Sequence, residues 1–220
     1  MPGDTGNKHA HRSSVTRTRF IEAAQELFAG RSIDAVSLNE ITVAAGQKNR
    51  NALQYHFGSR DGLLQAIIDH HAASVHALRA AWLAKLEGDM PPARAAARGL
   101  VVPLAQHIEN DPSGVYYVKI LSQLAALNSE VVNPASRSTL SFQSEEGLAP
   151  LIADALAHLQ PDEARRRMFL MVSITFHGLA DACRAAESAA IARALADREQ
   201  LFEQVAVAVE ALLAAPGLQT

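Results

Sequence analysis

The sequence predicts an all-α protein, and three observations lead to that prediction. Apolar residues make up 49% of the 220 positions, and they recur at the three- and four-residue spacing that places them on one face of a helix. Only 9 prolines and 12 glycines interrupt the chain. Strand-like alternation of apolar and polar residues is absent. We therefore expect about nine helices, arranged as an N-terminal three-helix head and a C-terminal helical body.

The head begins with residues 1–14, which lack the apolar core of a signal peptide. We predict that they form a disordered arm. A first helix over about 15–30 carries Phe20, Ala24, Leu27 and Phe28 on one face. A short helix follows over about 37–45, with the Ser37 hydroxyl as its cap. Gly46 supplies the left-handed backbone that ends it.

A short turn leads to the next helix, residues 50–57, and Asn49 at the end of that turn is its predicted cap. Leu53 and Phe57 face inward, which leaves Arg50, Asn51 and Gln54 outward. Arginine pairs with guanine in the DNA major groove, and asparagine or glutamine pairs with adenine. Helices 37–45 and 50–57 thus predict a helix-turn-helix that reads bases with these three residues. The alternative is that they form an ordinary solvated face.

A long helix over about 59–87 joins the head to the body. Ser59 is its predicted cap, and its inward stripe is Leu64, Ile67, His71, Val75, Leu78 and Trp82. At 1.5 Å per residue this helix is about 40 Å long. We expect the DNA-binding domain to occupy residues 15–60 and to extend into this helix to about 73, with the second domain over 74–220.

Breaks rich in Pro, Gly and Asn divide the body into five helices. They are expected over about 93–109, 113–128, 136–159, 161–186 and 195–215. Arg165, Arg166 and Arg167 are interpreted as a solvated helix edge rather than a nucleic-acid patch.

The last two helices are apolar over too much of their circumference for a surface position. One stripe can face the protomer's own core, and a second stripe needs another partner. A two-fold, four-helix interface with an identical chain satisfies both. A thicker monomer core is the alternative. The predicted interface residues are Val172, Phe176, Leu179, Phe202, Val205, Val209 and Leu212.

Charge and cysteine content are compatible with these predictions. The net charge is −3, yet residues 1–60 hold eight basic and five acidic residues, a balance of +3, against −6 in residues 61–220. A mildly basic head favours phosphate. The single cysteine, Cys183, fits a reducing cytoplasm. No apolar run reaches the roughly 20 residues that cross a bilayer.

Four blocks of the head resemble the DNA-binding domain of the TetR family of transcriptional repressors. They are TRTRFIEAAQELF (16–28), DAVSLNEI (34–41), AAG (44–46) and LQYHFGSRDGLLQAI (53–67), and the segment that contains them, from about Thr16 to Ala73, is about a quarter of the chain. Three positions depart from the family pattern: the turn at 47–49 is one residue longer, Ser32 replaces a glycine, and Gln54 replaces a tyrosine. The resemblance implies a dimer that binds a palindromic operator on double-stranded DNA through two recognition helices.

The family positions also imply phosphate contacts. Those expected here are Lys48, Tyr55, His56 and Arg60, with Ser37 and Thr42 as weaker candidates and Arg17 and Arg19 in the leading arm. Family members hold a small, mostly apolar effector among the helices of the body, and its binding releases the DNA. The expected lining residues are Trp82, His107, Tyr116, Tyr117, Phe142, Phe169 and His177.

Two other functional classes are possible alternatives. A DNA-binding dimer without an effector would use the body as a scaffold or a protein-docking surface. An all-α enzyme is disfavoured because the chain has no Gly-rich phosphate loop, nucleophile elbow or cysteine pair. His70, His71 and His76 radiate from their helix rather than converge, so we expect no metal site and no cofactor.

Overall fold

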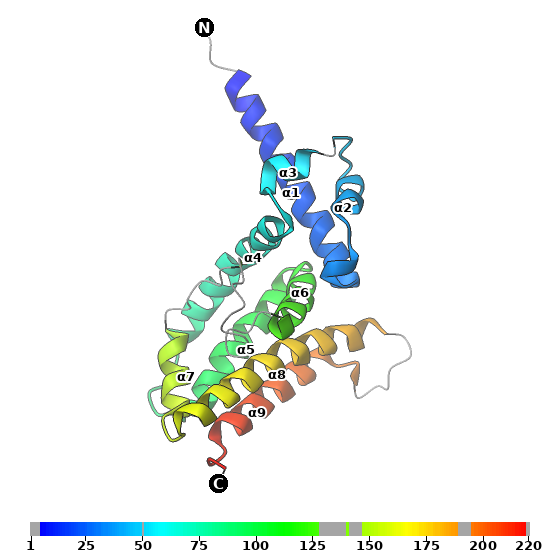
Figure 1. Cartoon of the computed structure of the whole chain (residues 1–220). Coiled ribbons are helices and arrows are strands. Elements are labelled where there is room, and N and C mark those ends of the chain that lie inside the picture. The colour runs from blue at the N-terminus through cyan, green and yellow to red at the C-terminus, as the bar shows by residue number, and fades with distance from the viewer. Residues whose placement is uncertain (1–4, 50, 128–139, 141–146, 189–194, 219–220) are drawn as a thin grey trace. The chain divides into compact units, whose positions relative to one another are not determined.

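The computed structural model describes residues 5–49, 51–127, 140, 147–188 and 195–218, and within them the chain forms nine α-helices and one 3₁₀ turn without strands (Figure 1). The all-α prediction is confirmed. The chain divides into two compact units. The N-terminal unit ends at His70 and includes Leu140, and the C-terminal unit begins at His71. The division falls inside the long helix that the sequence assigns to both domains.

The N-terminal unit contains α1 (Thr5–Gly30), η1 (Ile33–Ala35), α2 (Leu38–Ala44), α3 (Asn51–Phe57) and the first part of α4 (Arg60–Leu83). Helix α1 packs against η1 and α2, and α2 packs against α3. The core of the unit is made of fully buried side chains from these helices, namely Phe20, Phe28, Ile41, Leu53, Leu63 and Ile67.

Helix α1 is longer than the sequence predicts. It begins at Thr5, so residues 5–14 are helical where a disordered arm is expected, and residues 1–4 lie outside the described part. No proline or glycine occurs between Gly6 and Gly30. Since only those two residues strongly disfavour the helix interior, the sequence contains no strong helix breaker between Gly6 and Gly30.

The C-terminal unit contains the rest of α4 and five further helices. They are α5 (Pro92–Asn110), α6 (Gly114–Leu127), α7 (Leu148–Leu156), α8 (Pro161–Glu187) and α9 (Arg198–Ala214). Helix α8 packs against α6 and α9, and α5 packs against α7 and α9. Helix α4 ends at Leu83 rather than Glu87, because Lys85 and Leu86 bond back over three residues to Trp82 and Leu83. The helix predicted over 136–159 is described only from Leu148.

Helices α8 and α9 lie very close together at one point. A Cβ atom at Gly178 would lie 2.7 Å from a methyl carbon of Val205, so only glycine fits there without a shift. The burial of the side chains shows which stripe of α9 faces inward. Phe202, Ala206, Val209 and Leu213 are buried in the protomer, whereas Leu201, Val205 and Leu212 are only partly buried.

The predicted dimer interface needs correction for this reason. Leu179, Phe202 and Val209 are 0%, 3% and 0% exposed within one protomer, so they belong to its own core. The other four residues, Val172, Phe176, Val205 and Leu212, are half-buried and pack against the two core clusters, so each keeps a partly exposed side. Only Val205 and Leu212 of the predicted set lie on the stripe of α9 that remains partly open.

The interpretation of Arg167 as a solvated residue is wrong. Its side chain is buried, and the guanidinium donates to the carbonyls of Leu212, Ala215 and Pro216, each at 2.6 Å. These carbonyls lie at the C-terminal end of α9, where the last carbonyl groups of a helix have no donors within the helix. Arg167 therefore ties the end of α9 to the start of α8. Arg165 and Arg166 are exposed, as expected.

Candidate nucleic-acid interface

Helix α2 begins with a complete capping box. The Ser37 hydroxyl accepts from the backbone N–H of Glu40 at 3.2 Å, and the Glu40 carboxylate accepts from the backbone N–H of Ser37 at 2.8 Å. The second carboxylate oxygen of Glu40 accepts from Arg31 at 2.9 Å. The Ser37 bonds, followed by the Arg31 bond, lower the pKa of Glu40 to about 2. The ionised carboxylate thus fixes the start of α2.

Acid should weaken the N-terminal unit through Glu40. Because the folded-state pKa is about 2 against an ordinary 4.5, the stabilisation is complete above pH 4.5 and is lost as the pH falls toward 2. Glu40→Gln keeps the capping geometry but does not titrate. The stability advantage of the wild type over Glu40→Gln, measured by urea midpoints, should shrink across this window. A difference that is independent of pH would contradict the assignment.

The turn between α2 and α3 is built from one glycine and one asparagine. Gly46 has a φ of 67°, the left-handed conformation expected of it, and the N–H of Gln47 bonds to the Thr42 carbonyl at 3.0 Å. The Asn49 side-chain oxygen accepts from the backbone N–H of Asn51 at 3.0 Å. Asn49 therefore caps α3, as the sequence predicts, and the extra residue of the turn leaves the helix at its expected position.

Helix α3 presents one apolar and one polar side. Leu53 is 2% exposed and anchors the helix in the core. Asn51 and Gln54 are exposed, and Tyr55 is 83% exposed. Arg50 lies outside the described residues. The polar side can therefore reach the base edges of a major groove.

Aromatic contacts hold α3 against α1. The Phe20 ring lies 6.0 Å from that of Phe57 and 6.1 Å from that of His56, between centroids, and Arg17 lies over the Phe57 ring. Burial lowers the pKa of His56, and the positive charge of Arg17 lowers it further. The imidazole is thus uncharged at neutral pH and could serve a phosphate as a neutral N–H donor.

The other predicted phosphate contacts divide into two groups. Ser37, Lys48, Tyr55, Arg17 and Arg19 are exposed and remain candidates. Thr42 and Arg60 do not fit as well, for different reasons.

Thr42 is 3% exposed, and its hydroxyl donates to the Leu38 carbonyl at 2.8 Å, so its side chain is not accessible to DNA. Arg60 is partly buried and donates to the Ile33 carbonyl, and its guanidinium lies over the Phe28 ring. Arg60 therefore helps to hold the N-terminal unit together, and a phosphate contact would have to use its remaining N–H groups.

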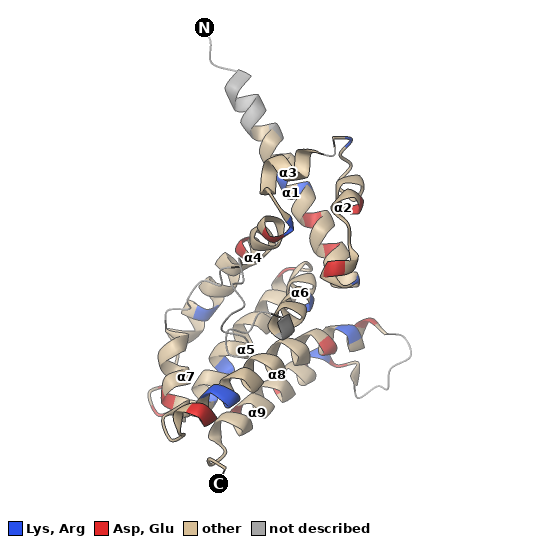
Figure 2. Cartoon of the chain, viewed as in Figure 1, with Lys and Arg blue, Asp and Glu red and all other residues tan. Residues whose placement is uncertain are grey.

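Charges of both signs occur on the N-terminal unit (Figure 2). Arg17 and Arg19 on α1 and Lys48 in the turn are basic, whereas Glu22 and Glu26 on α1 are acidic. The basic residues thus lie in the middle of α1, on the N-terminal side of the two glutamates, and in the turn before α3. This distribution favours phosphate locally, next to the exposed side of α3.

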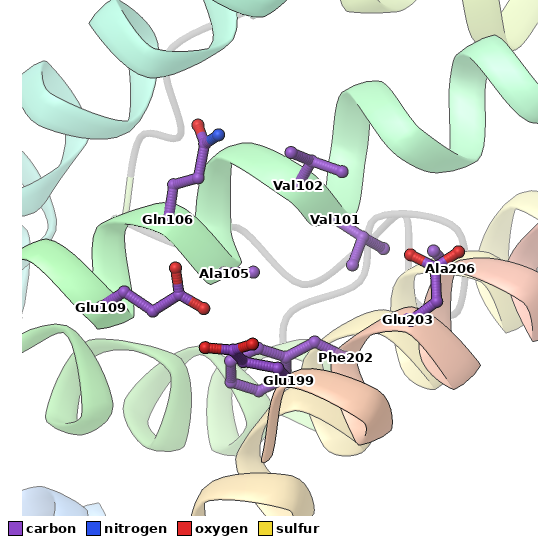
Figure 3. Close-up of a pocket in the computed structure, with 9 residues that line it drawn as sticks. All are labelled: Val101, Val102, Ala105, Gln106, Glu109, Glu199, Phe202, Glu203 and Ala206. Atoms are coloured by element: carbon purple, nitrogen blue, oxygen red, sulfur yellow. The ribbon is translucent and has the colours of Figure 1, made fainter. Parts of the chain in front are cut away.

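The expected effector-lining residues do not surround one cavity in the described part of the chain. Trp82 packs against α5, where its ring lies 3.1 Å from the Cβ position of Gly99. Tyr116, Phe169 and His177 are half-buried at separate places, and Phe142 lies outside the described residues. A hollow of about 260 Å³ between α5 and α9 contains none of the predicted residues, and Glu109, Glu199 and Glu203 lie around it (Figure 3).

Among the described residues of the predicted set, His107 and Tyr117 come together, and a third residue joins them. His71 from α4 lies 2.8 Å from His107 between ring nitrogens, and it stacks on Tyr117. The sequence places His71 on the inward stripe of its helix but gives no sign of this partner, because His107 is 36 positions away.

A sequence model of the family described as bacterial regulatory proteins, tetR family, matches residues 20–67, which include η1, α2, the Gly46 turn and α3. Residues 20–67 thus form a DNA-binding domain of the TetR type. This match supports the role of a DNA-binding transcriptional regulator, and α2 and α3 form the helix-turn-helix.

Solved structures of TetR-family regulators align with more than nine-tenths of the chain. One from Rhodococcus sp. is 23% identical and aligns over 91% of this chain and 99% of its own, with a TM-score of 0.51. Another, from Streptomyces coelicolor A3, is 19% identical over 92% and 96%, with a TM-score of 0.45. RolR in complex with resorcinol is 20% identical over 96% and 98%, with a TM-score of 0.43.

The Rhodococcus structure supports the TetR-like fold beyond the matched region. No curated protein matches the chain. The family whose model matches residues 20–67 is described as regulatory, so the enzyme alternative has no support from that match. None of the described helices combines the length and the apolar composition that crossing a bilayer requires.

Proposed function

We propose that this TetR-family regulator is a repressor that binds a palindromic operator as a homodimer and leaves it when a small effector binds. The observation that supports DNA reading most directly is α3. Leu53 and the Asn49 cap fix this helix, and Asn51 and Gln54 stand exposed on its outer side. We assign base contacts to Arg50, Asn51 and Gln54.

The proposed dimer uses α8 and α9, with a face that differs from the one predicted by sequence. Leu170 on α8 is 44% exposed, and Leu201, Val205 and Leu212 on α9 are partly buried. Ile174 on α8 is also only partly buried. The Gly178–Val205 contact puts these two stripes next to each other, so together they offer an apolar face to a second copy. We call this set the dimer face.

Two recognition helices read DNA better than one. A dimer sets them about 34–36 Å apart, which matches one helical turn of DNA and gives a palindromic site. An effector releases DNA only if it binds more tightly to the dimer conformation in which the two recognition helices are not spaced for DNA. The buried cluster of His71, His107 and Tyr117 lies on α4, α5 and α6 and is the place we propose for the effector.

The single cysteine, Cys183, is unbridged and buried, which supports a cytoplasmic location.

Asn51→Ala tests the base-reading role. The change should cost about 1–3 kcal/mol on the preferred duplex and relax discrimination at one base pair in each half-site. Binding to random DNA should stay the same. Fluorescence anisotropy on both duplexes measures this, and Asn110→Ala, at an exposed asparagine at the end of α5, is the control. An equal loss on random DNA would assign Asn51 to the backbone instead.

Lys48→Ala tests the phosphate role of the turn before α3. Each phosphate contact that is removed lowers the slope of log affinity against log salt by about one. The loss should be the same on all sequences, because phosphate contacts carry no sequence information. Lys85→Ala, which removes an exposed lysine of the C-terminal unit, should leave the slope unchanged. Equal slopes for the wild type and Lys48→Ala would remove Lys48 from the interface.

A further inference from the structure

A buried pair of histidines connects α4 with α5 in the C-terminal unit. Nδ1 of His71 and Nε2 of His107 lie 2.8 Å apart, and the two residues are 1% and 2% exposed. The Tyr117 ring of α6 stacks on His71 with 4.7 Å between centroids. Neighbouring groups from three helices thus fix the orientation of both imidazoles.

Asp111 brings a carboxylate to the same place. The potential metal-ligand atoms of His71, His107 and Asp111 all lie within 4.8 Å of one another. One oxygen of Asp111 accepts from the backbone N–H and the hydroxyl of Ser113, at 2.8 and 2.7 Å, and these bonds orient the carboxylate. Asp111 is partly exposed, so the cluster has a side that solvent can reach.

A hydrogen bond of the kind that supports metal-bound imidazoles is also present. Nδ1 of His107 lies 3.2 Å from the Ser74 hydroxyl. Such an outer bond sets the tautomer and the ring orientation of a metal-binding histidine, and it leaves Nε2 directed toward the cluster.

We propose that His71, His107 and Asp111 bind a divalent transition-metal ion. Two imidazole nitrogens and one carboxylate oxygen are a donor set that zinc and its neighbours in the first transition row accept. On binding, the imidazole that carries the N–H between the two rings changes tautomer: its proton passes to its other ring nitrogen through solvent, and both facing nitrogens then donate their lone pairs to the metal. Bonds of about 2.0–2.2 Å require the three groups to close by a small movement. Asp111, at the end of α5 and partly exposed, can make it.

Metal binding would also bear on regulation, and this part alone depends on the proposed function. His71 lies on α4, and the first part of that helix belongs to the N-terminal unit that carries α3. An ion held between α4 and α5 would fix the position of α4 against α5. The ion would therefore be an effector, or part of one.

The test uses the full chain, stripped of metal with a chelator and kept free of DNA, so its result does not depend on operator binding. Titration calorimetry with Zn²⁺ should show one ion bound per chain. Asp111→Asn keeps an acceptor for Ser113, and His107→Gln keeps a similar volume. Each should weaken zinc binding at least tenfold, by analogy with the roughly 10- to 100-fold losses seen when supporting groups are removed. His70→Ala, at the exposed neighbour of His71, should bind as the wild type does.

A second readout uses wild-type protein and Co²⁺, so it does not require any variant to fold. Cobalt bound by two imidazoles and a carboxylate should show visible absorption stronger than that of the hydrated ion, and Zn²⁺ should remove it by competition. Absence of saturable binding, or equal zinc affinity in the wild type, Asp111→Asn and His107→Gln, would overturn the proposal. In that case the two histidines are a hydrogen-bonded pair that only stabilises the core.

Discussion

Replacement of Arg167 by alanine should lower the free energy of unfolding by about 3 kcal/mol, since charge-assisted bonds to buried groups disappear and their acceptors stay buried. Arg167 is 6% exposed and donates to three carbonyls at the end of α9. Water cannot easily replace these bonds. Urea denaturation at neutral pH measures the change.

Arg165→Ala is the matched control for that experiment. Arg165 is two positions away on the same helix, and its side chain is 70% exposed beside Asp162. Its removal should change the stability by less than about 0.5 kcal/mol, as is usual for an exposed ion pair. The loss of unfolding free energy for Arg167→Lys should lie between those of the two alanine variants, because one ammonium group cannot donate in the planar, forked geometry of a guanidinium. If Arg167→Ala and Arg165→Ala have the same small effect, the capping role of Arg167 is wrong.

Leu170→Glu should dissociate the proposed dimer. The side chain is 44% exposed in the protomer, so the variant can fold, but in a two-fold interface it buries two unpaired charges. Breaking or adding unpaired buried charges costs about 3–5 kcal/mol, which corresponds to about two to four orders of magnitude in the dimer dissociation constant. Sedimentation equilibrium should show a monomer, and operator affinity should fall with it.

Val207→Glu provides the comparison. Val207 on α9 is 46% exposed, but it lies outside the stripe formed by Leu201, Val205 and Leu212. This variant should remain a dimer with the operator affinity of the wild type. Retention of the dimer by Leu170→Glu, or dissociation of both variants, would show that the dimer face is placed wrongly.

Local sequence signals predict the N-terminal unit well. Ser37, Gly46 and Asn49 act within a few residues of themselves, through caps and a left-handed turn, so their roles follow from the sequence. The anchor Leu53 follows from helical spacing in the same way. The burial of Thr42 does not follow from the sequence, because it depends on how α2 packs.

Long-range packing explains where the sequence predictions fail. A helix with two apolar stripes does not show which stripe its own protomer covers, so the sequence places Phe202 and Val209 in the dimer although they form the core. The role of Arg167 depends on carbonyls 45 to 49 positions later. His71 and His107 come from different helices, so the spacing of histidines along one helix cannot predict their contact.

Paired recognition by two copies of α3, in adjacent major-groove faces of one duplex, is the basis of the proposed function. Selection of bound duplexes from a random-sequence pool, followed by sequencing, tests it most directly. We expect recovery of an inverted repeat whose half-sites lie about 10 base pairs apart, or a multiple of that spacing. The Asn51→Ala variant should recover the same repeat with one position of each half-site free to vary. Recovery of single, unpaired half-sites, or no enrichment over the starting pool, would contradict paired recognition.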